Sequence, residues 1–281
     1  MHGNVLRTAV IIAAFSCLIL AIGAVAGGTG GLMIAVVVAL GASGVAYFGS
    51  DRIALSAMRA RPVSEWEYPQ LCRLVRELST VARVPVPRVC VSPALQPNAF
   101  AAGRNRRRAV ICCTEGILRI LDPDELRAVL AHEMSHVQSR DILVSSVAAG
   151  MATVITFLAS FAWLLPFGRG GGRLLKLLLM MVLGPVAALV IQLAVARSRE
   201  YQADAAGTLL TGDPLALARA LRKIELGTDA HPLMATGQLA AAGHLMIVGP
   251  FRSSGLGRLF STHPPVAERV RRLESLAGLP R

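Results

Sequence analysis

Four long, strongly apolar stretches of the 281-residue chain contain no Asp, Glu, Lys or Arg. An α-helix needs ~20 predominantly apolar residues to cross the hydrocarbon core of a bilayer, and each stretch meets or approaches that length. The chain is 54% hydrophobic with a mean hydropathy of +0.56, which is too apolar for an ordinary soluble domain. We therefore predict four transmembrane helices, over Thr8–Ala26, Leu32–Gly49, Ile142–Phe167 and Leu177–Ala196.

The first two stretches admit other interpretations. Leu32–Gly49 contains several glycines and a serine, so it could be a buried helix in a soluble core. Thr8–Ala26 follows Arg7 and could belong to a signal peptide. However, a second apolar stretch follows almost at once, and no Ala-x-Ala site with a polar continuation is apparent. We expect both stretches to be retained as membrane helices.

These helices divide the chain into a first pair (residues 1–49), a polar segment (50–141), a second pair (142–196) and a polar tail (197–281). Each pair returns the chain to its starting side, so the N-terminus and both polar parts share one side. That side holds nearly all the Lys and Arg residues. The loop between the second pair of helices carries Arg169, Arg173 and Lys176, which favour the opposite orientation. Because basic residues favour the cytoplasmic side, we expect a multi-pass protein of the plasma or inner membrane with cytoplasmic polar parts.

The formal net charge of +12 raises the possibility of nucleic-acid binding, and the run RNRRR (Arg104–Arg108) is its most basic segment. No nucleic-acid motif or aromatic-interleaved basic surface accompanies this run. Basic residues instead flank the apolar stretches, where they orient helices and meet anionic headgroups. We expect RNRRR to form a solvated turn between strands, and we expect no nucleic-acid partner.

The first polar segment has mixed secondary-structure signals. Asp122 is a suitable helix N-cap, Pro123 fits the first helical position and Glu125 completes a capping-box pattern. Nothing in the pattern ends this helix before Asp141. Before it, the pattern predicts a helix over Glu65–Ala82 and strands over Val84–Val91, Asn98–Ala102 and Ala109–Thr114.

The helix that begins at Asp122 carries the stretch AHEMSHVQSRD, with histidines at 132 and 136. Residues four apart share a helix face, so His132 and His136 can direct two nitrogens at one ion. Glu133 lies about 100° round the helix, beside such an ion. Two neutral nitrogen ligands and a nearby carboxylate are what a zinc hydrolase requires. The alternative is a pair of exposed histidines on a surface helix.

A catalytic zinc usually has three protein ligands and one open position. Glu200 is the best third candidate, and Asp204 on the same helix face could orient a ligand histidine by a hydrogen bond. The alternative for Glu200 is a juxtamembrane charge that pairs with a neighbouring arginine. His136 lies ~9 Å along a helix before Ile142, and Glu200 lies ~6 Å beyond Ala196. These groups can meet only if the second helix pair is a hairpin.

Four motifs stand in order along nearly the whole chain: PNAFAAG (Pro97–Gly103), LRAVLAHEMSHVQSRD (Leu126–Asp141), RSREYQAD (Arg197–Asp204) and FSTHPPVAERVRRL (Phe260–Leu273). With the four apolar stretches, they resemble the HtpX-type membrane zinc metallopeptidases, which are relatives of the prenyl-protein CAAX proteases. One small departure lies in PNAFAAG, where many relatives have Thr in place of Ala102.

The resemblance implies a mainly α-helical integral membrane protein with a cytoplasmic, zincin-like α+β metallopeptidase domain containing a small β-sheet. It implies one Zn²⁺ per subunit, held by His132, His136 and Glu200, with Glu133 as the catalytic base. The implied activity is endopeptidase cleavage of membrane or misfolded proteins at the cytoplasmic face, in protein quality control and the stress response. The expected partners are protein substrates and membrane lipids.

Two further site assignments accompany the resemblance. Asn98, Ala99, Phe100 and Ala101 fit an edge strand to which an extended substrate could add by main-chain hydrogen bonds; the alternative is an internal strand. His263 could donate a hydrogen bond to the tetrahedral oxyanion. It could instead occupy the open zinc position, or simply lie at the start of a helix after Thr262.

Two other functional classes remain to be weighed. A non-catalytic membrane scaffold or chaperone would use zinc structurally, and structural zinc sites usually have four protein ligands. A transporter would carry ionisable residues within its membrane helices, whereas the predicted helices contain only Gln192 and a few hydroxyls. We therefore expect a zinc metalloendopeptidase.

Overall fold

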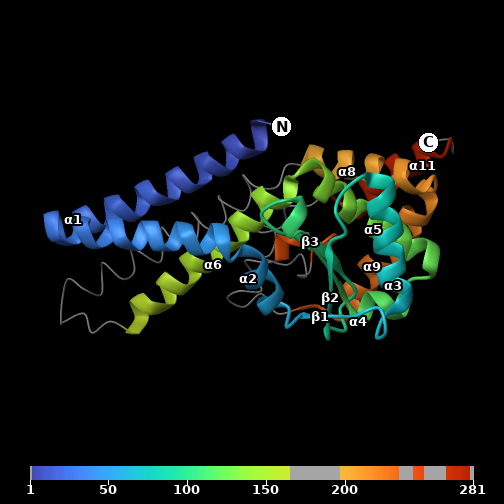
Figure 1. Cartoon of the computed structure of the whole chain (residues 1–281), viewed down its shortest axis with the longest axis horizontal. Helices are drawn as coiled ribbons and strands as arrows, with labels where there is room; N and C mark the ends of the chain where they lie inside the picture. The colour runs from blue at the N-terminus through green and yellow to red at the C-terminus, as the bar shows by residue number, and fades with distance from the viewer. Residues whose placement is uncertain (1, 165–196, 234–242, 250–263, 279–281) are drawn as a thin grey trace.

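A computed structural model describes residues 2–164, 197–233, 243–249 and 264–278 (Figure 1). The predicted fourth membrane helix, Leu177–Ala196, and His263 lie outside these ranges. The described elements, in chain order, are α1 (His2–Phe48), α2 (Ser50–Ala57), β1 (Arg61–Pro62), α3 (Pro69–Ala82), β2 (Arg88–Ser92), β3 (Ala99–Ala102), η1 (Arg106–Arg108), β4 (Val110–Thr114), α4 (Glu115–Ile120), α5 (Pro123–Ser139), α6 (Asp141–Leu164), α8 (Arg197–Thr211), α9 (Pro214–Ala230), η2 (Gly243–Leu245) and α11 (Val266–Leu276).

The first two predicted membrane helices are present as the two arms of α1, which Figure 1 shows as a long hairpin projecting from the rest of the molecule. Thr8–Val25 and Gly27–Phe48 are each long and apolar enough to cross a membrane. The chain reverses at Gly27 and Gly28, where Gly28 takes a positive φ of 56° that a side chain would strain. The turn thus uses only the first two residues of the glycine-rich run Gly27–Gly31 (GGTGG).

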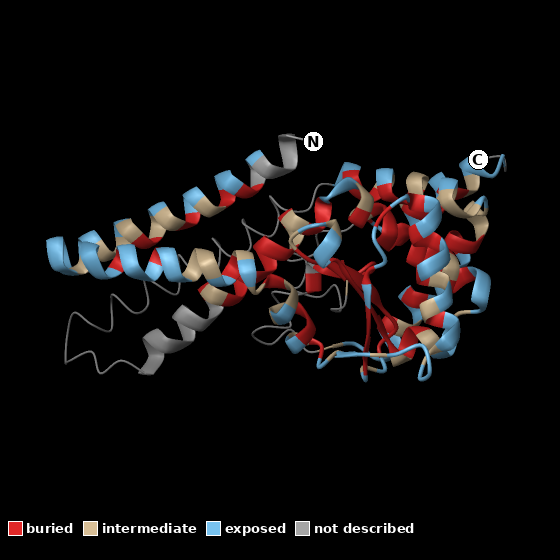
Figure 2. Ribbon diagram, in the orientation of Figure 1, coloured by how far each residue is buried: buried red, intermediate tan, exposed pale blue. Residues whose placement is uncertain are grey.

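The described part of the third predicted membrane helix is α6, which packs against both arms of α1. Ile11 and Phe15 of the first arm and Ala39 of the second share a buried apolar cluster with Val147 and Met151. A Cβ on Gly150 would lie 3.0 Å from the Cα of Ala46, so small residues let these helices approach closely. The side chains that face away from this cluster are largely exposed, as expected for surfaces that meet lipid (Figure 2).

The predicted small sheet has four strands in the order β1-β2-β4-β3. β2 and β4 are parallel, whereas β3 and β4 are antiparallel, with Ala99 opposite Cys113 and Ala102 opposite Val110. The RNRRR run lies between β3 and β4, where the turn was predicted, and its last three residues form the short helix η1. β3 is thus an edge strand of the sheet, and it contacts both α5 and α6.

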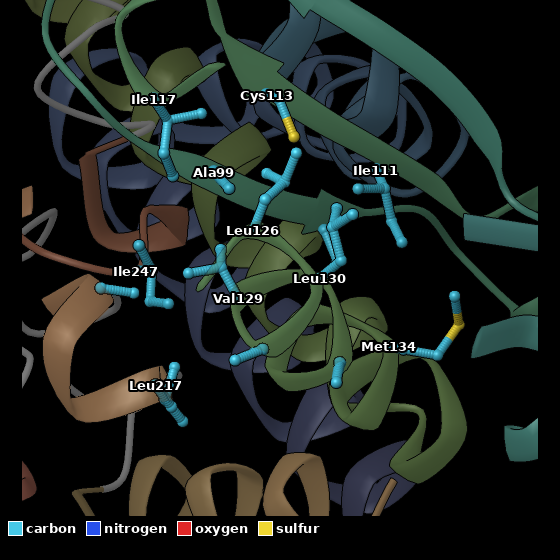
Figure 3. Close-up of a cluster of buried hydrophobic side chains, with 14 of the residues drawn as sticks. Ala99, Ile111, Cys113, Ile117, Leu126, Val129, Leu130, Met134, Leu217 and Ile247 are labelled. Carbon is cyan, nitrogen blue, oxygen red and sulfur yellow. The ribbon is translucent and has the colours of Figure 1, made fainter. Parts of the chain in front are cut away.

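Helix α5 packs against one face of this sheet (Figure 3). Each fully buried Leu or Val contributes roughly 1.5–3 kcal/mol relative to an exposed one, so this layer is a main source of stability. The opposite face is covered by α2, whose Ala54 and Leu55 pack near Phe100 and Cys112. The buried residues between α5 and the sheet include Ala99, Ala101, Ile111 and Cys113 of the strands and Leu126, Val129, Leu130 and Met134 of α5.

Several element boundaries differ from the sequence-based predictions: β3 and β4 each begin one residue later, at Ala99 and Val110, and three other differences are larger. Helix α3 begins at Pro69 rather than Glu65, because the residue before a proline disfavours helical geometry. Strand β2 begins at Arg88 rather than Val84, after the two prolines that cannot donate to a sheet. Helix α5 ends at Ser139, because Arg140 takes a left-handed conformation with φ 63°, and α6 then begins at Asp141.

Helices α8 and α9 cover the remaining side of α5, and α11 packs in turn on α8 and α9. The α5–α8 contact is unusually close. A Cβ on Gly207 of α8 would lie 2.9 Å from the backbone nitrogen of His132 and 3.0 Å from its Cα. The hydroxyl of Ser135 also reaches the carbonyl oxygen of Ala203 across this contact, at 3.4 Å. A glycine at 207 therefore sets the spacing of the two helices.

Replacing Gly207 with Ala should force α5 and α8 apart and lower the free energy of unfolding by about 1–3 kcal/mol. Thermal unfolding of the full-length protein in detergent measures this change. The matched control is Gly41→Ala, because a Cβ at Gly41 meets no atom within 4 Å. A Gly207→Ala protein as stable as the control would show that this contact does not constrain the fold.

Candidate metal centre

Helix α5 begins with the predicted capping box. Asp122 accepts hydrogen bonds from the backbone nitrogens of Asp124 and Glu125, at 3.1 and 2.9 Å, and the Glu125 carboxylate accepts one from the nitrogen of Asp122. This start fixes the register of the helix. His132 and Glu133 are consequently buried, with exposed fractions of 1% and 2%.

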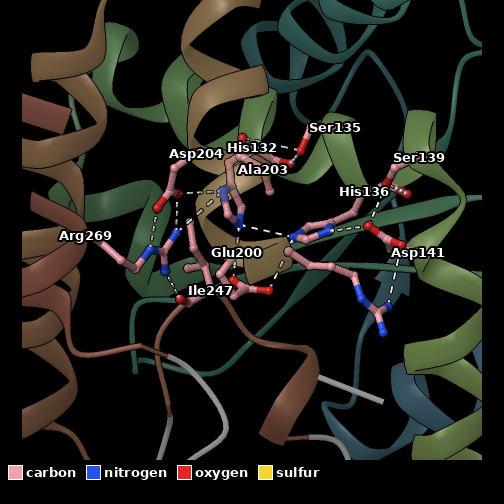
Figure 4. Close-up of polar contacts among 11 residues, drawn as sticks. His132, Ser135, His136, Ser139, Asp141, Glu200, Ala203, Asp204, Ile247 and Arg269 are labelled. Carbon is pink, nitrogen blue, oxygen red and sulfur yellow. Dashed lines mark hydrogen bonds and ion pairs between the residues drawn. The ribbon is translucent and has the colours of Figure 1, made fainter. Parts of the chain in front are cut away.

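The two histidines and Glu200 come together between α5 and α8 (Figure 4). The Nε2 atoms of His132 and His136 lie 3.3 Å apart. The Glu200 carboxylate oxygens lie 3.7 Å from Nε2 of His132 and 3.8 Å from Nε2 of His136. Within the described ranges, this is the one group of three or more His, Cys, Asp or Glu side chains with metal-binding geometry.

This cluster fits a zinc ion in its donor types and its spacing. Two imidazole nitrogens and a carboxylate oxygen are the ligand set of many catalytic zinc sites. Tetrahedral zinc with nitrogens at ~2.0–2.1 Å places two of them ~3.3–3.4 Å apart, close to the observed Nε2–Nε2 separation. The three donor atoms lie within 4.8 Å of one another, so one ion can contact them all after small side-chain movements.

His132 is oriented from behind by Asp204, which lies one helical turn after Glu200 on α8. The Asp204 carboxylate accepts a hydrogen bond from Nδ1 of His132 at 2.9 Å. That bond directs Nε2 of the same ring towards Glu200. The structure thus brings Asp204 to the position in which it could orient a ligand histidine.

Arg269 of α11 completes this arrangement and was not identified from the sequence. It is fully buried and donates two hydrogen bonds to Asp204, at 2.6 and 2.9 Å, and a third to the carbonyl oxygen of Ile247, at 2.7 Å. Burial alone would raise the pKa of Asp204, but the Arg269 guanidinium and His132 hold that pKa well below its usual range. Asp204 therefore stays negatively charged beside Nδ1 of His132.

His136 has a second carboxylate behind it, because Nδ1 of His136 faces Asp141 at 3.9 Å. Asp141 also accepts a hydrogen bond from the hydroxyl of Ser139 at 2.8 Å and faces Arg199 at 3.5 Å. Burial alone would lower the pKa of His136, but Asp141, Glu200 and Glu133 raise it to about 9. A metal ion would bind the neutral ring, so metal binding at this position would release a proton from His136.

Glu133 lies beside the cluster and faces strand β3. Burial raises the pKa of Glu133 to about 7, helped by the negative charge of Glu200, while His136 opposes the shift. The backbone N–H of Ala101 faces the Glu133 carboxylate and acts to lower its pKa. The carboxylate is thus held between the histidines and the proposed substrate strand.

The outer edge of β3 is already engaged near Ala99 by the segment Leu245–Val248. The backbone nitrogen of Ile247 donates to the carbonyl oxygen of Ala99 at 3.0 Å, and the Asn98 side chain donates to the carbonyl oxygen of Val248 at 2.9 Å. The same segment accepts the hydrogen bond from Arg269. An edge strand is therefore present as predicted, but part of its edge pairs with the chain itself.

Replacing Arg269 with Met should leave Asp204 as an uncompensated buried charge and lower the free energy of unfolding by about 3–5 kcal/mol. Denaturant unfolding in detergent measures this change. Arg271→Met is the matched control, because Arg271 is exposed on the same helix and its loss should change stability by less than about 0.5 kcal/mol. The double variant Arg269→Met, Asp204→Asn should recover part of the lost stability, because the buried charge is removed. Equal losses of stability in Arg269→Met and Arg271→Met would contradict this account.

Comparisons with known proteins agree with this geometry. Residues 65–277 match peptidase family M48. A protein of Kineococcus radiotolerans named Protease HtpX homolog is 53% identical over 288 residues, covering 99% of this chain and 98% of the relative. A protein of the same name from Pyrococcus furiosus is 47% identical over 277 residues, covering 96% of this chain and 95% of the relative.

A crystal structure of S. mikatae Ste24p matches with a TM-score of 0.49 and 21% sequence identity, over 93% of this chain and 62% of that one. The family match and the full-length relatives confirm the resemblance inferred from the four motifs. The chain belongs to peptidase family M48 and is a membrane metalloprotease related to the HtpX proteins.

Proposed function

We propose that the chain is a zinc-dependent endopeptidase that cleaves membrane or misfolded proteins at the cytoplasmic face of the membrane, in protein quality control and the stress response. The observation that carries this proposal is the group formed by the buried His132 and Glu200 and the half-buried His136, beside Glu133. A structural zinc usually has four protein ligands. Among the described residues the group contains three, which favours catalysis over the non-catalytic scaffold.

In this proposal, His132, His136 and Glu200 hold one Zn²⁺ per subunit, and Asp204 orients His132. When bound, zinc polarises the scissile carbonyl and lowers the pKa of water towards ~7. Glu133 takes a proton from the attacking water and passes it to the leaving amine nitrogen. The hydrogen bond from Nδ1 of His132 to Asp204 keeps that ring oriented throughout, and the Asp141 carboxylate faces Nδ1 of His136.

The substrate, in this proposal, adds as an extended strand along Asn98, Ala99, Phe100 and Ala101. The carbonyl oxygen of Ala99 and the nitrogen of Ala101 face away from β4, towards Ile247 and Glu133. Main-chain hydrogen bonds to such an edge give loose sequence preference, which suits varied protein substrates. We assign His263 as the donor to the oxyanion on sequence grounds alone.

We propose a four-helix topology with residues 1–49 and 142–196 in the membrane and residues 50–141 and 197–281 in the cytoplasm, in a multi-pass protein of the plasma or inner membrane. The α1 hairpin and its packing against α6 support the first three helices. A membrane hairpin over residues 142–196 would return the chain to the face that carries His136, where Glu200 lies. Arg52 and Arg140, near the ends of α1 and α6, suit the cytoplasmic side.

Replacing Glu133 with Gln should leave zinc bound and lower the cleavage rate of casein by about 10²–10⁴-fold, because the base that accepts the proton is lost. Replacing Glu200 with Ala should instead remove the zinc together with the activity. Zinc analysis of the purified proteins, beside the cleavage assay, distinguishes the two effects. A Glu133→Gln protein that digests casein at the parental rate would refute the proposed mechanism.

Replacing Ile247 with Pro should raise the rate of casein cleavage several-fold, because it removes the N–H that pairs with Ala99 and frees this edge for substrate. The Michaelis constant should fall while the zinc content stays unchanged. Ile247→Val, which keeps the N–H, is the matched control. Lower activity with intact zinc in the proline variant would mean that Leu245–Val248 supports the substrate strand instead of competing for it.

A further inference from the structure

We infer that six arginines form a binding surface for the headgroups of anionic membrane lipids. This arginine cluster consists of Arg52, Arg104, Arg106, Arg107, Arg108 and Arg140. The inference rests on the proposed insertion of α1 and α6 into the membrane and is independent of the chemistry at the metal centre. It assigns a role to the RNRRR run, which the peptidase mechanism leaves unused.

The loop that carries RNRRR is held at three points, on α6, on the last turn of α5 and on the last residue of α1. The backbone nitrogen of Gly103 donates to the hydroxyl of Ser146, on α6, at 2.9 Å. Arg106 donates to the carbonyl oxygen of Gln138, in the last turn of α5. The guanidinium of Arg104 lies over the ring of Phe48, the last residue of α1, at 5.2 Å from the ring centroid. The loop is thus fixed where two apolar helices meet the soluble part.

The other two members of the arginine cluster lie at the same end of these helices. Arg52 is in the first turn of α2, directly after α1, and Arg140 lies between α5 and α6. Asp51 and Arg88 form an ion pair at 3.6 Å, and the nitrogen of Arg88 donates to the carbonyl oxygen of Ala109. These contacts hold the start of α2 beside the end of the RNRRR loop.

The charge of the arginine cluster is not neutralised within the part of the chain that the structure describes. None of the six forms an ion pair with a described carboxylate, and the adjacent Asp51 and Asp141 face Arg88 and Arg199 instead. Arg52, Arg107, Arg108 and Arg140 are exposed to solvent. Clusters of four to eight basic residues beside a membrane helix bind anionic headgroups, with ~1 kcal/mol per residue.

The position of Phe48 favours a lipid over a soluble anion or a nucleic acid. Its side chain is 65% exposed at the end of an apolar helix, where an aromatic ring meets the boundary between hydrocarbon and headgroups. An arginine stacked on that ring places its charge at headgroup level while its stem lies along apolar surface. A lipid phosphate is the anion that is present at this depth.

Replacing Arg104, Arg107 and Arg108 together with Gln should weaken binding of phosphatidylglycerol by about a hundredfold, from the loss of ~1 kcal/mol per arginine. Binding is measured by titrating the full-length protein in mild detergent and counting bound lipid by native mass spectrometry. Phosphatidylcholine and inorganic phosphate are titrated in parallel. The corresponding triple Lys variant should retain most of the binding, because the charge is kept.

The matched control replaces three exposed arginines on helices that lie away from α1, Arg73 of α3, Arg119 of α4 and Arg271 of α11, with Gln and should leave lipid binding unchanged. Unchanged phosphatidylglycerol binding by the RNRRR variant would overturn the inference, as would an equal loss in the control. Displacement of phosphatidylglycerol by inorganic phosphate at the same concentration would also overturn it, because the site would then serve a soluble anion. Lipid binding is read directly, so these outcomes hold whether or not the chain cleaves casein.

Discussion

The close contact between α5 and α8 determines whether this molecule can have a metal centre. His132 and His136 lie on one helix and Glu200 on the other, far away in the sequence. One face of α8 carries Glu200, Asp204 and Gly207. Glu200 is the candidate ligand and Asp204 orients His132, while the missing side chain at Gly207 lets α8 approach α5 closely enough for both contacts. A side chain at 207 would act directly against the backbone of His132.

That contact places several charged groups in a region from which water is excluded. The desolvation of Asp204 and Arg269 is offset only because they form a bidentate pair, with further bonds to His132 and to the carbonyl oxygen of Ile247. The same network connects three distant parts of the chain: α8, α11 and the segment that pairs with β3. The geometry at the histidines is therefore coupled to the geometry of the edge strand.

Local patterns made much of this arrangement predictable. The capping box at Asp122 and the four-residue histidine spacing depend on helix geometry alone, and both appear as expected. Arg269 was missed because VAERVRRL resembles any amphipathic surface helix, and only tertiary packing reveals that one of its arginines is buried. Its position within the motif FSTHPPVAERVRRL (Phe260–Leu273) was the available signal. No sequence signal indicated the pairing of Ile247 with Ala99, because the segment Leu245–Val248 carries no strand pattern.

X-ray absorption spectroscopy of the purified zinc-loaded protein tests the central claim most directly, because it identifies the atoms bound to the metal. The account predicts nitrogen and oxygen neighbours at ~2.0–2.2 Å, including two imidazole rings, and no sulfur. Cys113 is buried near Glu133, which makes a thiolate ligand the concrete alternative. A zinc–sulfur distance of ~2.3 Å, or a spectrum with no imidazole contribution, would contradict the assignment of His132, His136 and Glu200 as the metal ligands.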